Sequence, residues 1–302
     1  MSIDSNILYY KKSAKSWTSA LPLGNGRLGA MIYGGAQKEL ISLNHDELWT
    51  GYPRTYQHMC SHDAFLKARE LALEGKLVEA EDILEAEFEG YNSQAYMPFG
   101  DIEVTCHKGM VKNYERTLDL STAVHTVTYE KNSVRFKRES FVSAVNNAMI
   151  MNFSSNSEKA VNITVKMKSE LKHTTFTQGE YLILDGTCPS NSPCNEEYES
   201  SDYKKYPDDP SKSGMSFRGV VKVISDGKTA YCDDKIIITD ANSATLYFTC
   251  ESSFNGFDKH PVTQGKGDKN SCIETLDKAF ERGFDAFVHL AAFKAAGESM
   301  LV

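Results

Sequence analysis

Apolar and polar residues alternate with a period of two from Asp101 to about Phe153. Ile102 and Val104 alternate with Glu103 and Thr105, which is the pattern of a half-buried strand. Further strands are predicted at 124–129, 134–137, 148–153, 161–167, 181–184, 220–224, 235–239 and 245–250. Because these strands follow one another with almost no helix between them, they favour an antiparallel β-sandwich over a parallel α/β sheet.

Residues 62–89 have helical spacing instead. Phe65, Ala68 and Ala72 recur at intervals of three and four, and a second apolar series runs from 77 to 88. Gly75 separates the two series, and a glycine after a helix is a common way to end it. The segment therefore predicts a helical hairpin inserted into a β fold.

A second helical segment begins near Ser271. Ser271 and Glu274 fit the capping box, in which a hydroxyl and a carboxylate satisfy the first free N–H groups of a helix. One face of the expected helix is apolar and contains Leu276, Phe280, Phe284, Phe287 and Leu290. Such a face needs a partner surface, so we expect a homodimer through this helix, or aggregation, if nothing else covers it.

The expected fold class is mainly β: a large antiparallel β-sandwich, or super-sandwich, with a helical hairpin insertion and a C-terminal linker helix. We expect residues 1–268 to form the β-sandwich domain with the insertion at 62–89. Residues 269–302 would then be the linker helix and a tail.

Residues 24–29 read Gly-Asn-Gly-Arg-Leu-Gly, a literal match to the dinucleotide-binding fingerprint, and Asp46 follows about twenty residues later. That fingerprint needs a strand before the first glycine and a helix after the last one. Pro22 interrupts the approach, and residues 30–35 read as a short strand closed by a turn. The glycines are better explained as turn positions around Asn25.

Net charge and targeting signals narrow the choice of partners. The net charge is −8 and no basic block exceeds two residues, so we expect no nucleic-acid partner. The chain has no run of eighteen apolar residues and no signal-peptide pattern at its start, so we expect neither membrane insertion nor export. The seven widely spaced cysteines fit reduced thiols, and the expected location is cytoplasmic.

Several phrases of the sequence resemble the start of bacterial α-L-fucosidases of glycoside hydrolase family 95. They lie in order along the chain at 8–12, 17–18, 20–35, 43–51, 94–102, 114–123 and 138–141. The resemblance covers about residues 7–290 and is lost after about Phe293. It implies an enzyme that removes terminal α-1,2-linked fucose by inversion, and a fucosylated oligosaccharide as the partner of the complete enzyme.

The resemblance also implies that the catalytic carboxylates, and the asparagines that activate water, lie in a helical barrel that follows this segment. No residue of this chain matches them, so we assign no catalytic residue and expect neither a cofactor nor a metal. Asp101 and Glu103 would share one face of a strand, but a solvated face explains them better than an acid–base pair.

Residues 44–49 are the best candidates for a role beyond folding. Asn44, Asp46, Glu47 and Trp49 combine an amide, two carboxylates and an indole, and this mixture can bind a sugar through a flat ring and orienting hydrogen bonds. The alternative is that Trp49 fills the core or a domain interface while Asn44 and Asp46 satisfy a turn.

Two residues of the phrase at 94–102, Gln94 and Tyr96, join this set as expected substrate-proximal residues. The candidates are Asn44, Glu47, Trp49, Gln94 and Tyr96. We expect their loop to face the barrel and shape the rim of the pocket in the complete enzyme.

A zinc site is the weaker interpretation of three nearby histidines. His58 and His62 are four residues apart, and His45 is not far away. No His-Glu-x-x-His or Cys-x-x-Cys accompanies them, so the spacing does not favour metal binding. The sequence thus predicts a structural and pocket-shaping domain without turnover of its own, and the alternative is a free-standing carbohydrate-binding module.

Overall fold

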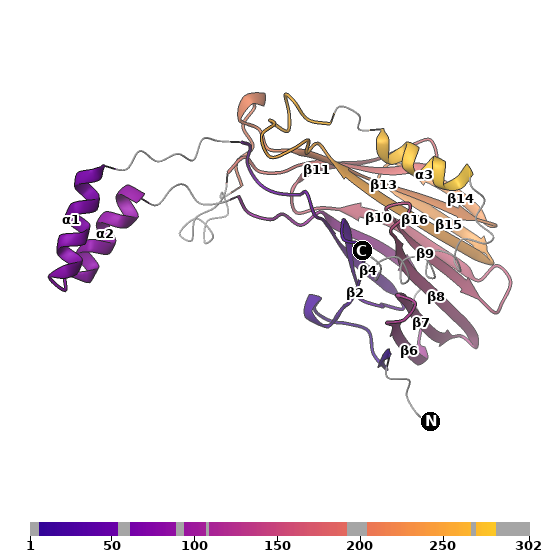
Figure 1. Cartoon of the computed structure of the whole chain (residues 1–302). Helices are drawn as coiled ribbons and strands as arrows, with labels where there is room; N and C mark the ends of the chain where they lie inside the picture. The colour runs from indigo at the N-terminus through magenta and orange to yellow at the C-terminus, as the bar shows by residue number, and fades with distance from the viewer. Residues whose placement is uncertain are drawn as a thin grey trace.

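The computed structural model describes residues 6–53, 61–88, 94–106, 109–191, 204–266 and 270–281. In this part of the chain, two antiparallel sheets of nine and seven strands pack face to face (Figure 1). This arrangement confirms the expected β-sandwich.

In the nine-stranded sheet the spatial order is β1 (Ile7–Tyr10), β6 (Val111–Asp119), β7 (Val124–Lys131), β8 (Val134–Ser143), β9 (Ala148–Ser155), β16 (Ser243–Ser252), β13 (Ser216–Ser225), β12 (Tyr181–Thr187) and β11 (Lys172–Gln178). In the seven-stranded sheet it is β14 (Lys228–Cys232), β15 (Lys235–Ala241), β10 (Val161–Lys168), β5 (Gly100–Cys106), β4 (Lys38–His45), β3 (Leu28–Ile32) and β2 (Leu21–Gly24). Each strand predicted by the period-two pattern is present.

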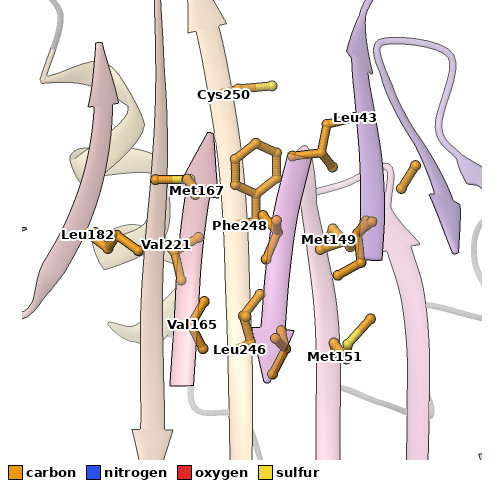
Figure 2. Packing of buried hydrophobic residues seen from close by; sticks show 14 of the residues in the cluster. Leu43, Met149, Met151, Val165, Met167, Leu182, Val221, Leu246, Phe248 and Cys250 are labelled. Carbon is orange, nitrogen blue, oxygen red and sulfur yellow. The ribbon is translucent and has the colours of Figure 1, made fainter. Parts of the chain in front are cut away.

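The main core lies between the sheets. Side chains of the seven-stranded sheet, such as Leu43 and Val165, meet side chains of the nine-stranded sheet, such as Met149, Leu246 and Phe248 (Figure 2). All of these are almost fully buried. Burying such side chains contributes about 1.5–3 kcal/mol each relative to leaving them in water, so the alternating apolar positions explain how the two sheets hold together.

The glycine-rich segment is a hairpin turn between β2 and β3. The Asn25 side-chain oxygen accepts hydrogen bonds from the backbone N–H groups of Arg27 (3.0 Å) and Leu28 (2.8 Å). Gly26 has a φ of 93°, a conformation that glycine adopts without strain. A strand follows the motif, where a dinucleotide site would need a helix, so the turn interpretation is confirmed.

The helical hairpin is also present, as α1 (His62–Leu73) and α2 (Leu77–Phe88). Figure 1 shows the two helices side by side and set apart from both sheets. Gly75 between them has a φ of 79°, as expected for a glycine that ends a helix. Gly90, which follows the second apolar series in the sequence, lies outside the described residues. No helix in the described ranges has the length and apolarity needed to cross a membrane.

The last described helix, α3 (Ser271–Glu281), packs on the outer face of the nine-stranded sheet over β13 and β16 (Figure 1). Cys272 and Leu276 are fully buried there against Val220 and Tyr247. The central strands of this sheet are therefore buried on both faces. Two short 3₁₀ helices, η1 (Trp17–Ser19) and η2 (Pro210–Lys212), complete the fold.

Two sequence expectations about α3 need comment. Ser271 already belongs to the helix, and Glu274 N–H donates to the Asn270 carbonyl (3.0 Å). Asn270 thus holds the cap position that the sequence pattern assigned to Ser271. Leu276 is covered by this chain's own sheet, whereas Phe284, Phe287 and Leu290 lie outside the described residues, so a dimer through them stays a prediction.

Replacement of residues 54–93 by a Gly-Ser linker of about four residues should leave the sandwich stable. The ends are already close, since Thr50 N–H donates to the Ala95 carbonyl at 2.9 Å. We expect the melting temperature measured by calorimetry to stay within a few degrees. Ile102→Ala, which opens a cavity in the core, should lower stability by about 2–5 kcal/mol in the same assay. Loss of the cooperative transition in the linker variant would show that the hairpin is part of the core.

Candidate functional site

The candidate site is the loop that follows β4, residues 46–51, at one end of the sandwich. Asp46 N–H donates to the Arg27 carbonyl (3.0 Å), and Leu48 N–H donates to the His45 carbonyl (3.1 Å). Leu48 and Thr50 are buried. These contacts anchor alternate residues of the loop in the fold and leave Trp49 directed outward.

The Glu47 carboxylate joins three distant segments of the chain. It accepts hydrogen bonds from Arg27 Nη2 (2.8 Å), Ser252 Oγ (2.7 Å) and Lys266 Nζ (3.3 Å), and its side chain is only 13% exposed. Burial alone would raise the pKa of Glu47, but the Ser252 hydrogen bond and the Lys266 charge outweigh it and lower this pKa. The carboxylate is therefore ionised and held in place.

Trp49 and Tyr96 form an aromatic pair on the surface of this loop. Their ring centroids are 5.2 Å apart with planes at 69°, an edge-to-face arrangement, and an isolated antiparallel bridge joins the two residues. Trp49 Nε1 donates to the Asp46 carbonyl (3.0 Å) and Tyr96 Oη donates to the His45 carbonyl (3.0 Å). Because both polar ends are bonded within the loop, the rings are fixed while 41% and 42% of their area stays exposed.

Gln94 supports the base of the same loop. Its side-chain Nε2 donates to the Tyr52 carbonyl (3.1 Å). Gly51 has a φ of 78°, and a Cβ there would come within 2.9 Å of that amide. A side chain at position 51 would therefore displace Gln94 and disturb the loop.

The structure thus brings together four of the five predicted site residues, Glu47, Trp49, Gln94 and Tyr96, around one loop. Asn44 is different. It lies on the outward side of β4 and lines a separate cavity together with Trp17 and Asp101. The prediction that Asn44 and Trp49 share a single binding surface has no support in this geometry.

His45 is a buried residue of the inner face of β4. Its Nδ1 accepts the Glu47 N–H (3.3 Å), and burial lowers its pKa, so the imidazole is neutral at neutral pH. His58 lies outside the described residues. Within the described ranges no three His, Cys, Asp or Glu side chains are grouped to hold a metal ion.

Asp101 and Glu103 do share the outward face of β5, as the sequence predicts. Glu103 is ion-paired with Lys38 (2.9 Å) and Lys168 (2.7 Å); burial opposes these contacts, but the two lysines lower its pKa. Burial raises the pKa of Asp101. The two lysines thus hold Glu103 in ion pairs on the outward surface of the sheet.

Sequence reasoning missed three residues of the site: Arg27, Ser252 and Lys266. Arg27 lies in the glycine-rich turn between β2 and β3. Because β3 pairs with β4, recognising this hairpin in the sequence could have placed Arg27 near the end of β4. Ser252 and Lys266 lie 205 and 219 positions after Glu47, and no local pattern marks them. They reach the loop only through the three-dimensional packing of the chain.

Comparison with known proteins agrees with this architecture. A solved structure titled "Putative kojibiose phosphorylase from human microbiome" matches with a TM-score of 0.52 at 12% identity, over 97% of this chain and 38% of that chain. At this identity the likeness concerns the fold alone. It shows that the fold of this chain is a large β-sandwich that also occurs within that longer protein.

The chain belongs to the family described as "Glycosyl hydrolase family 65, N-terminal domain", whose model matches residues 8–256. The matched range includes both sheets and the loop of Trp49. The chain is 30% identical over 273 residues to Alpha-L-fucosidase 2 of Arabidopsis thaliana, which is 87% of this chain and 32% of the plant protein. It is 32% identical over 148 residues to Probable alpha-fucosidase A of Aspergillus niger, over 46% of this chain and 18% of that protein.

The chain therefore spans about a third of the length of the plant relative. It is an N-terminal domain of a glycoside hydrolase in the group related to fucosidases. This finding confirms the expectation of an N-terminal β-sandwich domain that the sequence phrases implied.

Glu47→Gln should lower the free energy of unfolding at pH 7 by about 1–3 kcal/mol, because it removes the charge from a partly buried hydrogen-bond network. The pKa of Glu47 is lowered by folding, so its stabilisation is present above the unfolded value of about 4.3 and is lost as pH falls through the folded value. Denaturant unfolding at pH 7 and at pH 3 measures this difference.

The matched control is Glu158→Gln, which changes an exposed carboxylate in the turn between β9 and β10 and should alter stability little at either pH. If Glu47→Gln has the same effect at both pH values, the ionised form of Glu47 does not stabilise the loop.

Proposed function

We propose that this chain is the N-terminal β-sandwich domain of an α-L-fucosidase of the family 95 type, which acts on terminal α-1,2-fucosylated glycans by inversion. Two named relatives are fucosidases, and the sequence phrases resemble that family. The linkage and the stereochemistry come from that resemblance.

The observation that carries this proposal is the aromatic pair of Trp49 and Tyr96, whose polar ends donate hydrogen bonds to the Asp46 and His45 carbonyls. A fixed, half-exposed aromatic surface can pack against the apolar face of a sugar ring, and the rigid loop lowers the entropy cost of that contact. We infer that the loop shapes the rim of the fucose pocket where this domain meets the catalytic part of the enzyme.

Glu47 is not suited to be a catalytic acid. Inverting hydrolysis needs one carboxyl group that is protonated near neutral pH and a second carboxylate that activates water. Glu47 has the opposite property, because its pKa is lowered and three donors occupy its oxygens. In this proposal the catalytic carboxylates belong to the remaining two thirds of the enzyme, and the chain alone has no turnover.

A free-standing carbohydrate-binding module is the second candidate. The exposure of Trp49 and Tyr96 favours it, since such modules present an aromatic platform to solvent. The two functions differ in what the isolated chain does at this loop: a module binds glycans there with measurable affinity, whereas a pocket rim does so only in the complete enzyme.

Trp49→Ala in a full-length enzyme that carries this domain should lower kcat/KM for fucose release from 2′-fucosyllactose about tenfold, since the loss of one aromatic sugar contact costs about 1 kcal/mol or more. Phe65→Ala is the control, because Phe65 is a comparably exposed aromatic on α1, away from the sandwich. Unchanged kinetics for Trp49→Ala, with the control also unchanged, would leave Trp49 with a packing role and contradict the proposal.

A further inference from the structure

A second cavity opens on the outer face of the seven-stranded sheet, away from the Trp49 loop. Its volume is about 320 Å³, which is within the range of small-ligand pockets. Six of its lining residues carry the argument: Trp17, Tyr33, Ser42, Asn44, Asp101 and Glu170. Of the predicted substrate-proximal residues, Asn44 alone lines it.

One wall of the cavity is aromatic. Trp17 begins η1 and is 54% exposed, and Tyr33 follows β3. The turn at Trp17 is held by the side chains of Ser16 and Ser19, whose hydroxyl oxygens lie 3.1 Å apart. Ala14 N–H donates to the Tyr33 carbonyl (2.8 Å). The loop that carries Trp17 is thereby tied to the end of β3, which holds the backbone at Trp17 beside the cavity.

The sheet supplies the polar groups. Ser42 and Asn44 alternate along the outward face of β4, and Asp101 is paired in register with Ser42 on β5. Asp101 is half-buried, and burial raises its pKa while the Ser42 hydroxyl and the Lys168 ammonium oppose this shift. Glu170 follows β10. A hydroxyl, an amide and two carboxylates thus meet an exposed indole in one cavity.

We propose that this cavity is a saccharide-binding site, distinct from the pocket rim at Trp49. An aromatic ring packs on the apolar face of a pyranose, and amide and carboxylate oxygens accept hydrogen bonds from its hydroxyl groups. Two carboxylates disfavour an anionic ligand such as a phosphate. A neutral sugar can pack on the ring and donate hydrogen bonds to the acceptors. A metal ion has no use for the aromatic wall, and the cavity offers fewer oxygen ligands than such an ion usually takes.

The cavity and α3 lie on different sheets of the sandwich. The cavity lies on the seven-stranded sheet, whereas α3, the last described element, packs on the outer face of the nine-stranded sheet (Figure 1). The proposed site does not depend on the proposed function, because a saccharide site at Trp17 requires no fucosidase activity.

Saturation-transfer-difference NMR and calorimetric titration of the chain with L-fucose, D-galactose and 2′-fucosyllactose test the proposal. We expect at least one of these sugars to bind and Trp17→Ala to weaken its binding about tenfold, as expected for the loss of one aromatic contact. Asn44→Ala, which removes a polar group and leaves the ring, should also weaken binding. Phe65→Ala, on the separate helix α1, should leave it unchanged, and EDTA should have no effect.

Absence of binding for all three sugars at tens of millimolar would overturn the proposal. So would binding that Trp49→Ala abolishes and that Trp17→Ala and Asn44→Ala leave intact, an outcome that places the sugar at the other loop and favours a binding module there. Because Trp17 is largely exposed, its replacement should not unfold the chain. If Trp17→Ala does unfold it, Asn44→Ala tests the cavity independently.

Discussion

The buried ion pair between Glu39 and Arg138 fixes the relative position of the two sheets. Glu39 belongs to β4 of one sheet and Arg138 to β8 of the other, and both are almost fully buried. Glu39 also accepts the Gly34 N–H (2.7 Å), and Arg138 Nη2 donates to the Gly35 carbonyl (3.2 Å). Removing one partner of such a pair leaves the other charge buried without a partner and typically lowers stability by about 3–5 kcal/mol. The turn between β3 and β4 is therefore held tightly to the opposite sheet.

Strand β4 connects this constraint to both candidate binding surfaces. At its beginning Glu39 ties it to the nine-stranded sheet, and along its outward face Ser42 and Asn44 line the cavity of Trp17. Beyond its end, Glu47 draws Arg27, Ser252 and Lys266 together and fixes the loop that presents Trp49. A single well-anchored strand thus positions two sets of side chains, and neither surface depends on a mobile loop for its geometry.

Much of the fold follows from the alternation of apolar and polar residues, which predicted the strands, and from the glycine-separated helical spacing, which predicted α1 and α2. The burial of Glu39 and Arg138 was not predicted, because charged residues are usually exposed. The ion pair that stabilises them joins two different sheets and is visible only in the structure. The hydrogen-bond network of Glu47 was not predicted either, because its members are distant in the sequence. The surface that covers Leu276, the outer face of the nine-stranded sheet, could have been predicted. The run Ala-Met-Ile-Met at 148–151 lacks the alternating polar residues of a sheet with one face in water, and this predicts burial on both faces.

The central claim is that this domain positions substrate and contributes no turnover of its own. The most direct test is an assay of the purified 302-residue chain, with its intact mass confirmed, for fucose release from 2′-fucosyllactose. The account predicts no release above that of a mock purification, because it places the catalytic carboxylates in a part of the enzyme that this chain does not include. Release that follows the chain through successive purification steps would mean that catalytic carboxylates lie within these residues, and it would contradict the account.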